Sequence, residues 1–244
     1  MRARGRTRPG SASRSTRGFT LLELLIAIAV LASISLLIYG AFAGMRQSKD
    51  GIQRVGDRYR EGRIALGRIS RDLQSAYLSG HVPINLQNAV VITAFVATQG
   101  TPADRVDFNS FANQRLDRDS HESDQAEISY FGSPDPAEPG ITDLARRVST
   151  LPDLDMQKGG RVEVLATDID LFELEYLDPT TGQWTETWDT RQAIGQVNRL
   201  PLQIRIVLVL NGGKRSDQGG ERETIRFATT VGLPIQRPLT FATQ

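Results

Sequence analysis

One carboxylate, Glu23, stands near the start of an apolar run that continues to Tyr39. A run of about 20 apolar residues is long enough to cross a bilayer as a helix. An ionised side chain at membrane depth costs about 3 kcal/mol even on lenient insertion scales, so it needs a partner or a function. From the apolar run alone, Glu23 would be interpreted as the acid of an ordinary signal anchor that reaches the lipid headgroups.

The other chemistry-bearing residues form no catalytic pattern. The chain has no cysteine, which excludes disulfides, thiolate metal sites and cysteine catalysis. Its two histidines, His81 and His121, are far apart in the sequence, and no G-x-S-x-G motif accompanies them. The paired glycines Gly212-Gly213 follow a predicted strand and favour a turn over a phosphate loop. The sequence therefore predicts no enzyme, no cofactor and no small-molecule substrate.

An acidic stretch offers weak candidates for a calcium site. Its carboxylates could present oxygen ligands to Ca²⁺, but the spacing lacks the glycine and the terminal glutamate of an EF-hand loop. Neighbouring arginines also dilute the negative charge, so a solvated loop is the favoured interpretation. The candidate residues are Asp117, Asp119, Glu122 and Asp124.

The residues around Glu23 carry a family resemblance. The segment Arg17-Gly18-Phe19-Thr20-Leu21-Leu22-Glu23 resembles the class III signal of type IV prepilins and of the pseudopilins of type II secretion. In that family prepilin peptidase cuts after the glycine and N-methylates the new first residue. The resemblance implies cleavage between Gly18 and Phe19, N-methylation of Phe19, and a role for Glu23 in pairing with the N-terminal amine of a neighbouring subunit. A secretory signal is cut after its apolar region, whereas this cut precedes it, so the apolar helix would stay on the mature protein.

The charge distribution predicts the orientation in the membrane. The net charge is +1, but residues 1–18 contain six arginines and no acid, so the mature chain would have 23 basic and 28 acidic residues, a net charge of −5. This balance does not indicate nucleic-acid binding. A basic leader before an apolar helix predicts a cytoplasmic N-terminus. We therefore expect a single membrane span with the rest of the chain on the far side, and the resemblance implies that the membrane is the inner membrane and the C-terminal domain periplasmic.

Four regions are expected along the chain: a cleaved leader over 1–18, a transmembrane and assembly helix over 19–43, an amphipathic helix over 44–80, and an antiparallel β domain over 81–244. No proline occurs between Phe19 and Pro83, so one helix can run unbroken and stop near Gly80. Charged residues such as Arg58 and Asp72 are expected on its solvated faces. Its apolar stripe is predicted to pack on the sheet of its own domain, with a coiled coil as the alternative that heptad spacing leaves open. The stripe consists of Ile52, Val55, Tyr59, Gly62, Leu66, Ile69, Leu73 and Ala76.

The rest of the chain predicts strands separated by turns. Trp184 and Trp188 are expected on one face of a single short strand, in the core against the long helix rather than as a ligand-stacking platform. Residues 202–210 alternate cleanly and should form a hairpin with 223–231. Residues 144–150 are expected to return as the hairpin partner of 126–131, with a short helix as the alternative, after a turn over 132–140. The remaining predicted strands are 89–97, 105–111, 161–165, 169–176 and 183–189.

The predicted fold class is α+β, a long N-terminal helix packed on an antiparallel sheet domain, as in pilins. Beyond residue 45 the pattern resembles the J-type minor pseudopilin, through Tyr59 to Tyr77, Leu174-Glu175-Tyr176-Leu177-Asp178, Trp184 to Trp188, and Leu200-Pro201. The absence of cysteine also removes the C-terminal disulfide loop of many type IV pilins.

The resemblance implies a non-enzymatic structural subunit at or near the tip of the periplasmic pseudopilus of type II secretion, where it supports protein export. The implied partners are prepilin peptidase, other minor and major pseudopilins, the inner-membrane secretion platform and membrane lipid. The main alternative is a minor pilin of a type IV pilus with a role in priming, adhesion or DNA uptake. A further alternative is a β domain that binds secreted substrates.

Overall fold

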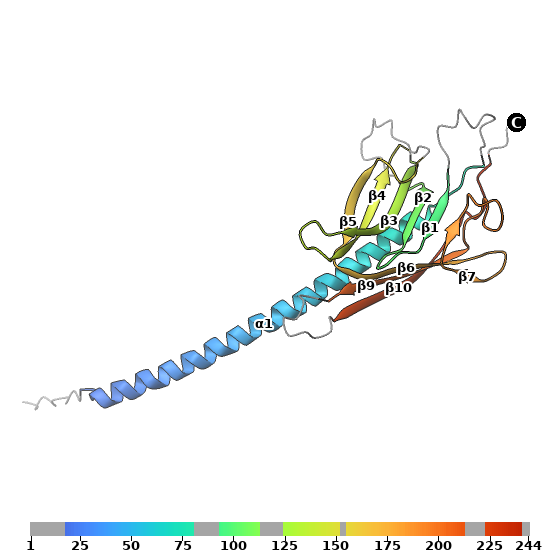
Figure 1. The fold of residues 1–244 in the computed structure, drawn as a ribbon. Helices are drawn as coiled ribbons and strands as arrows, with labels where there is room; N and C mark the ends of the chain where they lie inside the picture. Colours follow the sequence, from blue (N-terminus) through green and yellow to red (C-terminus); the bar gives the residue numbers. More distant parts are fainter. Residues whose placement is uncertain (1–17, 81–92, 113–123, 152–154, 213–222, 241–244) are drawn as a thin grey trace, which may run out of the picture. The chain divides into compact units, whose positions relative to one another are not determined.

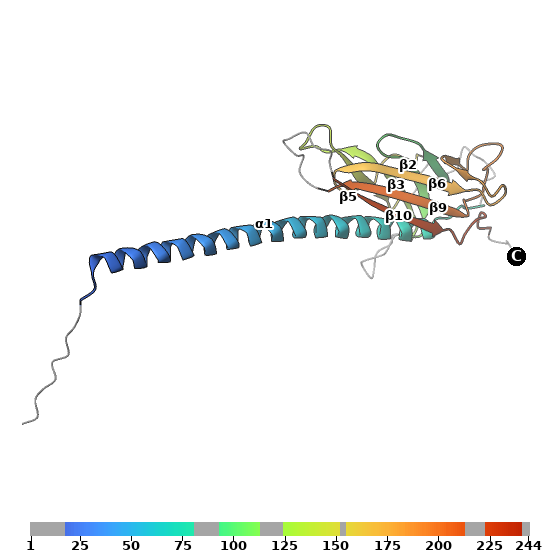
Figure 2. The same cartoon turned by 90° about the horizontal axis from the view of Figure 1, so that it is seen from below.

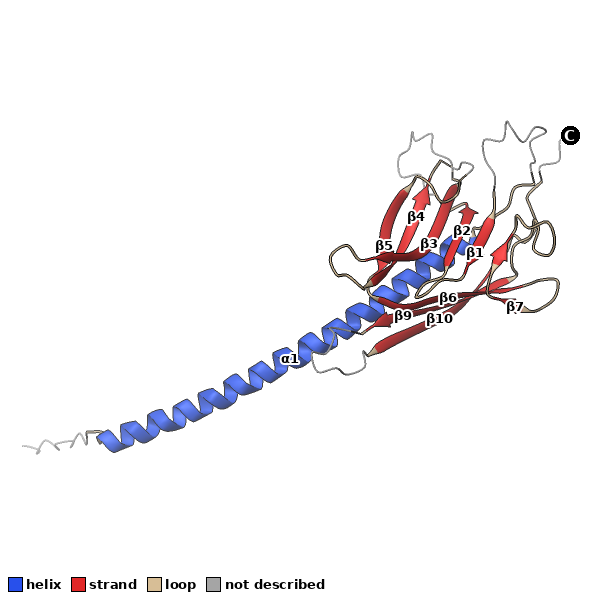
Figure 3. Ribbon diagram, viewed as in Figure 1, coloured by secondary structure: helices blue, strands red, loops and turns tan. Residues whose placement is uncertain are grey.

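The fold consists of one long helix and two antiparallel sheets (Figure 1). The computed structural model describes residues 18–80, 93–112, 124–151, 155–212 and 223–240. The chain divides into two compact units, Met1–Ile52 and Gln53–Gln244. Helix α1 (Leu21–Gln74) supplies most of the described part of the first unit and the first element of the second. Figure 3 shows that strands and loops make up the rest of the second unit.

Between Glu23 and Arg46, α1 carries no charged residue, and no residue of this apolar run is buried against the protein. The two serines of the run are satisfied within the helix, because Ser33 Oγ donates to the carbonyl of Ala29 and Ser35 Oγ to that of Leu31, each at 2.8 Å. Such internal bonding is what an apolar solvent requires, since lipid tails offer no hydrogen-bond partner. This half of the helix is therefore suited to lipid or to other helices.

The described residues of the second unit form ten strands in two sheets. One sheet has six strands in the order β5-β4-β3-β2-β1-β8, and the other has four in the order β10-β9-β6-β7. Every neighbouring pair is antiparallel. The strands are β1 (Phe95–Thr98), β2 (Arg105–Ser110), β3 (Ala126–Pro134), β4 (Thr142–Ser149), β5 (Arg161–Ala166), β6 (Ile169–Leu177), β7 (Trp184–Thr185), β8 (Trp188–Asp189), β9 (Gln203–Asn211) and β10 (Thr224–Gly232).

The helix and the two antiparallel sheets confirm the α+β prediction. The two hairpins expected from alternation, β3 with β4 and β9 with β10, are both present. The strand predicted over 89–97 is shorter in its described part, because Thr93 and Ala94 precede β1 without strand structure. The turn predicted over 132–140 is also shorter, because β3 continues to Pro134, which pairs with Thr142.

The prediction of a single strand over 183–189 is wrong. Trp184 belongs to β7, which pairs with β6 in the four-stranded sheet, whereas Trp188 belongs to β8, which pairs with β1 in the other sheet. The chain changes sheets between the two residues. Trp188 is fully buried in the core, as expected, but Trp184 is partly exposed and lies under the guanidinium of Arg205, 4.3 Å from the ring centroid.

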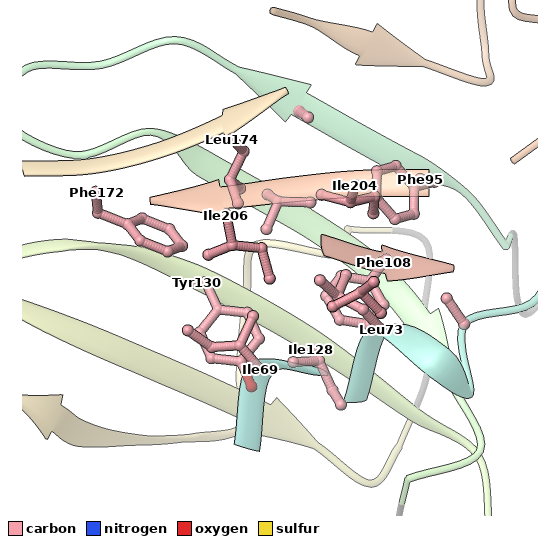
Figure 4. Packing of buried hydrophobic residues seen from close by; sticks show 14 of the residues in the cluster. Ile69, Leu73, Phe95, Phe108, Ile128, Tyr130, Phe172, Leu174, Ile204 and Ile206 are labelled. Carbon is pink, nitrogen blue, oxygen red and sulfur yellow. The ribbon is translucent and has the colours of Figure 1, made fainter. Parts of the chain in front are cut away.

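The core lies between the C-terminal part of α1 and the inner faces of both sheets (Figure 4). Ile69 and Leu73 of the helix face Phe108, Ile128 and Tyr130 of the six-stranded sheet, and large apolar residues of β6 and β9 close the other side. In Figure 2, strand β10 runs alongside the same part of the helix. The inner-face side chains of β6 and β9 are Phe172, Leu174, Tyr176, Ile204, Ile206, Leu208 and Leu210.

The sequence predicts that the helix stops near Gly80, but it ends at Gln74. Just after the helix end, the hydroxyl of Ser75 donates to the carbonyls of Arg71 and Asp72 in the last turn. The next residues join the six-stranded sheet, because Ala76 forms an isolated bridge with Ser110 and the N–H of Tyr77 donates to the carbonyl of Asn109 at 3.0 Å. Backbone pairing with β2 therefore replaces the last expected turns of helix.

Candidate functional site

The helix begins directly after the predicted cleavage position. Gly18, Phe19 and Thr20 precede α1 and are exposed, so the Gly18–Phe19 peptide bond lies outside the helix. Thr20 is the N-cap: its Oγ1 accepts the backbone N–H of Glu23 at 3.2 Å, and its carbonyl accepts that of Leu24. The T-x-x-E spacing is that of a capping box, and it could have identified this cap from the sequence.

Glu23 occupies the first turn of the helix. A carboxylate there is favoured by the positive end of the helix dipole. Within the described residues no side chain forms an ion pair with it. The Glu23 carboxylate, three residues after the N-cap, is therefore available to pair with a positive charge of another molecule. The apolar run that follows is long enough to span a membrane by length and composition.

The second half of α1 is attached to the β domain by polar contacts that the sequence did not reveal. Arg58 was expected on a solvated face, but most of its side chain is covered. Its guanidinium donates to the carbonyls of Asn211 at 2.9 Å, Thr167 at 2.9 Å and Asp168 at 3.2 Å. It also pairs with Glu61 at 2.6 Å, and Glu61 accepts the N–H of Thr167 at 2.7 Å. Two helix residues thereby hold the β5–β6 turn.

A buried ionic cluster makes the second attachment, and it corrects the expectation that Asp72 is solvated. The Asp72 carboxylate is 2% exposed and accepts the Tyr130 hydroxyl and the Arg146 Nε, each at 2.7 Å. Arg146 is 3% exposed and also pairs with Glu163 at 2.9 Å. The cluster therefore joins the helix to β3, β4 and β5. Arg68, one turn earlier on the helix, adds a fourth charge 3.4 Å from Asp72.

The electrostatics of this cluster follow from burial and charge. Burial opposes the positive charge of Arg146, but the Asp72 carboxylate, Tyr130 and Glu163 outweigh it and raise the pKa of the guanidinium above its ordinary value. Burial and the nearby Asp72 charge raise the pKa of Tyr130 well above its ordinary value. At neutral pH Arg146 is therefore a cation and the Tyr130 hydroxyl is a neutral donor. Losing either member of the Asp72–Arg146 pair would leave an uncompensated buried charge.

Close packing forms the third attachment. A Cβ built on Gly62 would lie 2.4 Å from the Phe227 ring of β10, so only glycine allows this approach. Tyr59 packs edge-on against the same ring, with centroids 5.7 Å apart. The predicted apolar stripe is thus buried only from Gly62 onward. Ile52 and Val55 remain 72% and 40% exposed, and Tyr59 is 47% exposed despite its contact with Phe227, which corrects the expectation that the whole stripe packs on the sheet.

No metal site emerges from the part of the chain that the structure describes. Three of the calcium candidates, Asp117, Asp119 and Glu122, lie outside the described residues, as do both histidines. Asp124 is described and contributes to a raised pKa of Tyr77. Among described residues, no group of three or more histidine, aspartate or glutamate side chains is placed to hold a metal ion.

The sequence matches two known family profiles. The profile of type II secretion system protein J matches residues 40–218, and that of the prokaryotic N-terminal methylation motif matches residues 13–39. The methylation-motif match contains Gly18, Phe19 and Glu23. The protein J match contains the residues by which Arg58 and Asp72 attach α1 to the β domain.

Two solved structures are similar at low identity. One is the GspK–GspI–GspJ complex of the type 2 secretion system of enterotoxigenic Escherichia coli, with 14% identity, a TM-score of 0.44 and coverage of 72% of this chain and 97% of that chain. The other is a type IV-like pilin from Thermus thermophilus, with 12% identity, a TM-score of 0.43 and coverage of 72% and 96%. Because the protein J profile spans most of the sequence, the chain belongs to the type II secretion system protein J family and is a minor pseudopilin.

Proposed function

We propose that the chain is cut between Gly18 and Phe19 by prepilin peptidase, N-methylated on Phe19, and assembled at or near the tip of the periplasmic pseudopilus as a subunit without catalytic activity. The observation that carries this proposal is the position of the motif. The Gly18–Phe19 bond is exposed and outside the helix, and the capped apolar helix starts two residues later. A protease needs an accessible, non-helical bond, and this segment offers one.

Cleavage would also supply a partner for Glu23, which forms no ion pair among the residues that the structure describes. The cut creates a positively charged amine on Phe19, in the mature subunit. A carboxylate at membrane depth is stabilised when it meets such a charge, because the cost of leaving it unpaired is about 3 kcal/mol. We infer that Glu23 of one subunit pairs with the Phe19 amine of its neighbour among the other pseudopilins, so that correct assembly selects for cleaved partners.

The attachments of α1 explain how assembly would act on the β domain. The subunit would be held in the inner membrane by residues 19–43, with the arginine-rich leader in the cytoplasm and the β domain in the periplasm, as the positive-inside rule favours. When the secretion platform extracts the helix, the load passes to the β domain through Arg58, Asp72 and the Gly62–Phe227 contact. These contacts bind the β domain to the part of α1 that belongs to the same unit.

Processing is tested by Gly18→Val in cells that contain prepilin peptidase, with the N-terminal mass of the membrane-bound protein as readout. The wild-type chain should start with methylated Phe19, and Gly18→Val should keep its leader because a branched side chain does not fit the peptidase site. Gly10→Val is the control, since it changes a glycine of the same leader away from the cut. Mature-sized product from Gly18→Val would refute the assigned position.

Pairing is tested by Glu23→Leu, which should leave membrane insertion intact but reduce incorporation into pseudopili. Ser33→Ala is the matched control, because the Ser33 hydroxyl is already bonded within its own helix. Normal incorporation of Glu23→Leu would contradict the assembly role of the carboxylate while leaving the processing site untouched.

A further inference from the structure

The far end of the apolar run has a composition different from its beginning. Between Glu23 and Arg46 the sequence has no charged residue. Arg46 is then the first cation, and it follows two exposed aromatic residues, Tyr39 and Phe42, which are 76% and 59% exposed. Aromatic residues and arginine are typical of the layer where a membrane meets water.

These three residues share one face of α1. Together with Ser35, Ile38 and Ala43 they line one hollow on the helix surface. Spacings of three and four residues bring side chains onto the same face, so both rings precede Arg46 along one stripe of the helix. Among the described residues Arg46 forms no hydrogen bond or ion pair, in contrast to Arg58, whose guanidinium is fully engaged.

The depth of this face agrees with the dimensions of a bilayer. From Leu21 to Arg46 the helix rises about 38 Å at 1.5 Å per residue. A bilayer has a hydrocarbon core of roughly 30 Å and a total thickness of roughly 40–45 Å with headgroups. When the start of α1 lies at one boundary, the Arg46 guanidinium reaches the headgroups of the opposite leaflet, while Tyr39 and Phe42 lie at the level of the glycerol and upper acyl region of that leaflet.

We propose that Tyr39, Phe42 and Arg46 form a collar that binds the phosphate of an anionic glycerophospholipid, an inference that rests on the proposed membrane insertion of α1. The guanidinium donates to the phosphate oxygens in a two-pronged geometry that suits phosphate groups. The aromatic rings pack against the glycerol and upper acyl region, where amphipathic rings are stable. The collar sets the depth from which the subunit is extracted.

The test uses the full-length chain in vesicles made of equal parts phosphatidylglycerol and phosphatidylcholine. Phe42→p-benzoylphenylalanine places a photo-cross-linker inside the collar, and mass spectrometry of the adducts reports which headgroup was captured. This readout is local, so the arginine-rich leader does not contribute to it. We expect phosphatidylglycerol adducts to exceed their share of the vesicle, and Arg46→Gln to reduce this preference about fivefold, the effect of one basic residue near an anionic surface.

Arg54→Gln is the matched control, because Arg54 is an exposed arginine of the same helix about 12 Å further along its axis. It should leave the preference unchanged. Equal losses in the two variants would indicate diffuse attraction and overturn the collar, as would adducts in the ratio of the vesicle or to a second copy of the chain. Alkaline carbonate extraction of the same samples distinguishes the two levels: an extractable protein contradicts insertion itself, whereas an inserted protein without the preference contradicts only the collar.

Discussion

Replacing Asp72 with alanine should destabilise the β domain strongly, although the residue lies near the end of a helix whose other acids are mostly exposed. The carboxylate is 2% exposed and accepts bonds from Tyr130 and Arg146. Asp72→Ala leaves the buried Arg146 guanidinium without its main counter-charge. Removing one partner of a buried pair costs roughly 3–5 kcal/mol. Because Glu163 still pairs with Arg146 and is partly solvated, we expect the lower end, about 3 kcal/mol.

The measurement is urea unfolding of the full-length chain in detergent micelles, followed by tryptophan fluorescence. Trp188 is fully buried in the core, so its emission reports unfolding of the β domain. With a slope of about 1–3 kcal/mol per molar urea, a loss of about 3 kcal/mol moves the midpoint down by at least about 1 M. Asp57→Ala is the matched control, because Asp57 pairs with Arg60 at an exposed site on the same helix and should cost below about 1 kcal/mol.

A double variant separates the cost of a lost contact from that of a stranded charge. Asp72→Leu combined with Arg146→Leu removes both charges and fills part of the space with apolar atoms. Such replacements are often neutral or stabilising, so the double variant should recover most of the loss. If Asp72→Ala behaves like Asp57→Ala, or if the double variant is no better than the single, the argument from the buried charge is refuted.

Two further predictions concern close packing and alkaline pH. Gly62→Ala should destabilise the chain by about 1 kcal/mol or more, because the added methyl meets the Phe227 ring. Gly56→Ala is the control and should stabilise the chain by up to about 1 kcal/mol, because a Cβ at Gly56 meets no other atom. Equal urea midpoints for the two variants would contradict the contact between Gly62 and Phe227. Burial, with the charges of nearby acids, raises the pKa of Tyr77 to about 12. Between pH 10 and 12 the folded chain therefore keeps a proton that the unfolded chain releases. The free energy of unfolding falls over this range by at most about 1.4 kcal/mol per pH unit. Tyr77→Phe should therefore be more stable to urea than the wild type above pH 10. At pH 7 the two should match, since the Tyr77 hydroxyl has no hydrogen-bond partner among the described residues. A Tyr77→Phe variant less stable than the wild type at pH 7 would show that the hydroxyl is hydrogen-bonded.

Local patterns predicted much of this fold. The pilin-like helix and the alternating hairpins depend on short-range periodicity, which a single sequence displays, and the assignment to the J-type minor pseudopilin is confirmed by the family match. The N-cap at Thr20 was equally available from the T-x-x-E spacing. Cleavage at Gly18, methylation of Phe19 and the pairing of Glu23 stay predictions.

The features that the sequence did not reveal depend on contacts distant in the chain. Asp72 is polar and sits among other charges, and only the approach of Arg146, 74 positions later, makes it a core residue. Trp184 and Trp188 are four residues apart, yet they belong to different sheets, because β7 pairs with β6 and β8 pairs with β1. The end of the helix at Gln74 likewise follows from pairing of Ala76 with Ser110 and not from a helix-breaking residue.

The central claim, that this minor pseudopilin supports type II secretion, is tested most directly in a strain that lacks it. Release of exported proteins and pilus-dependent surface motility are measured side by side, with the wild-type chain and Gly18→Val as complementing copies. The account predicts lost export with normal motility, restored by the wild type and not by Gly18→Val. Normal export with lost motility would contradict the assignment to secretion and indicate a type IV pilus instead.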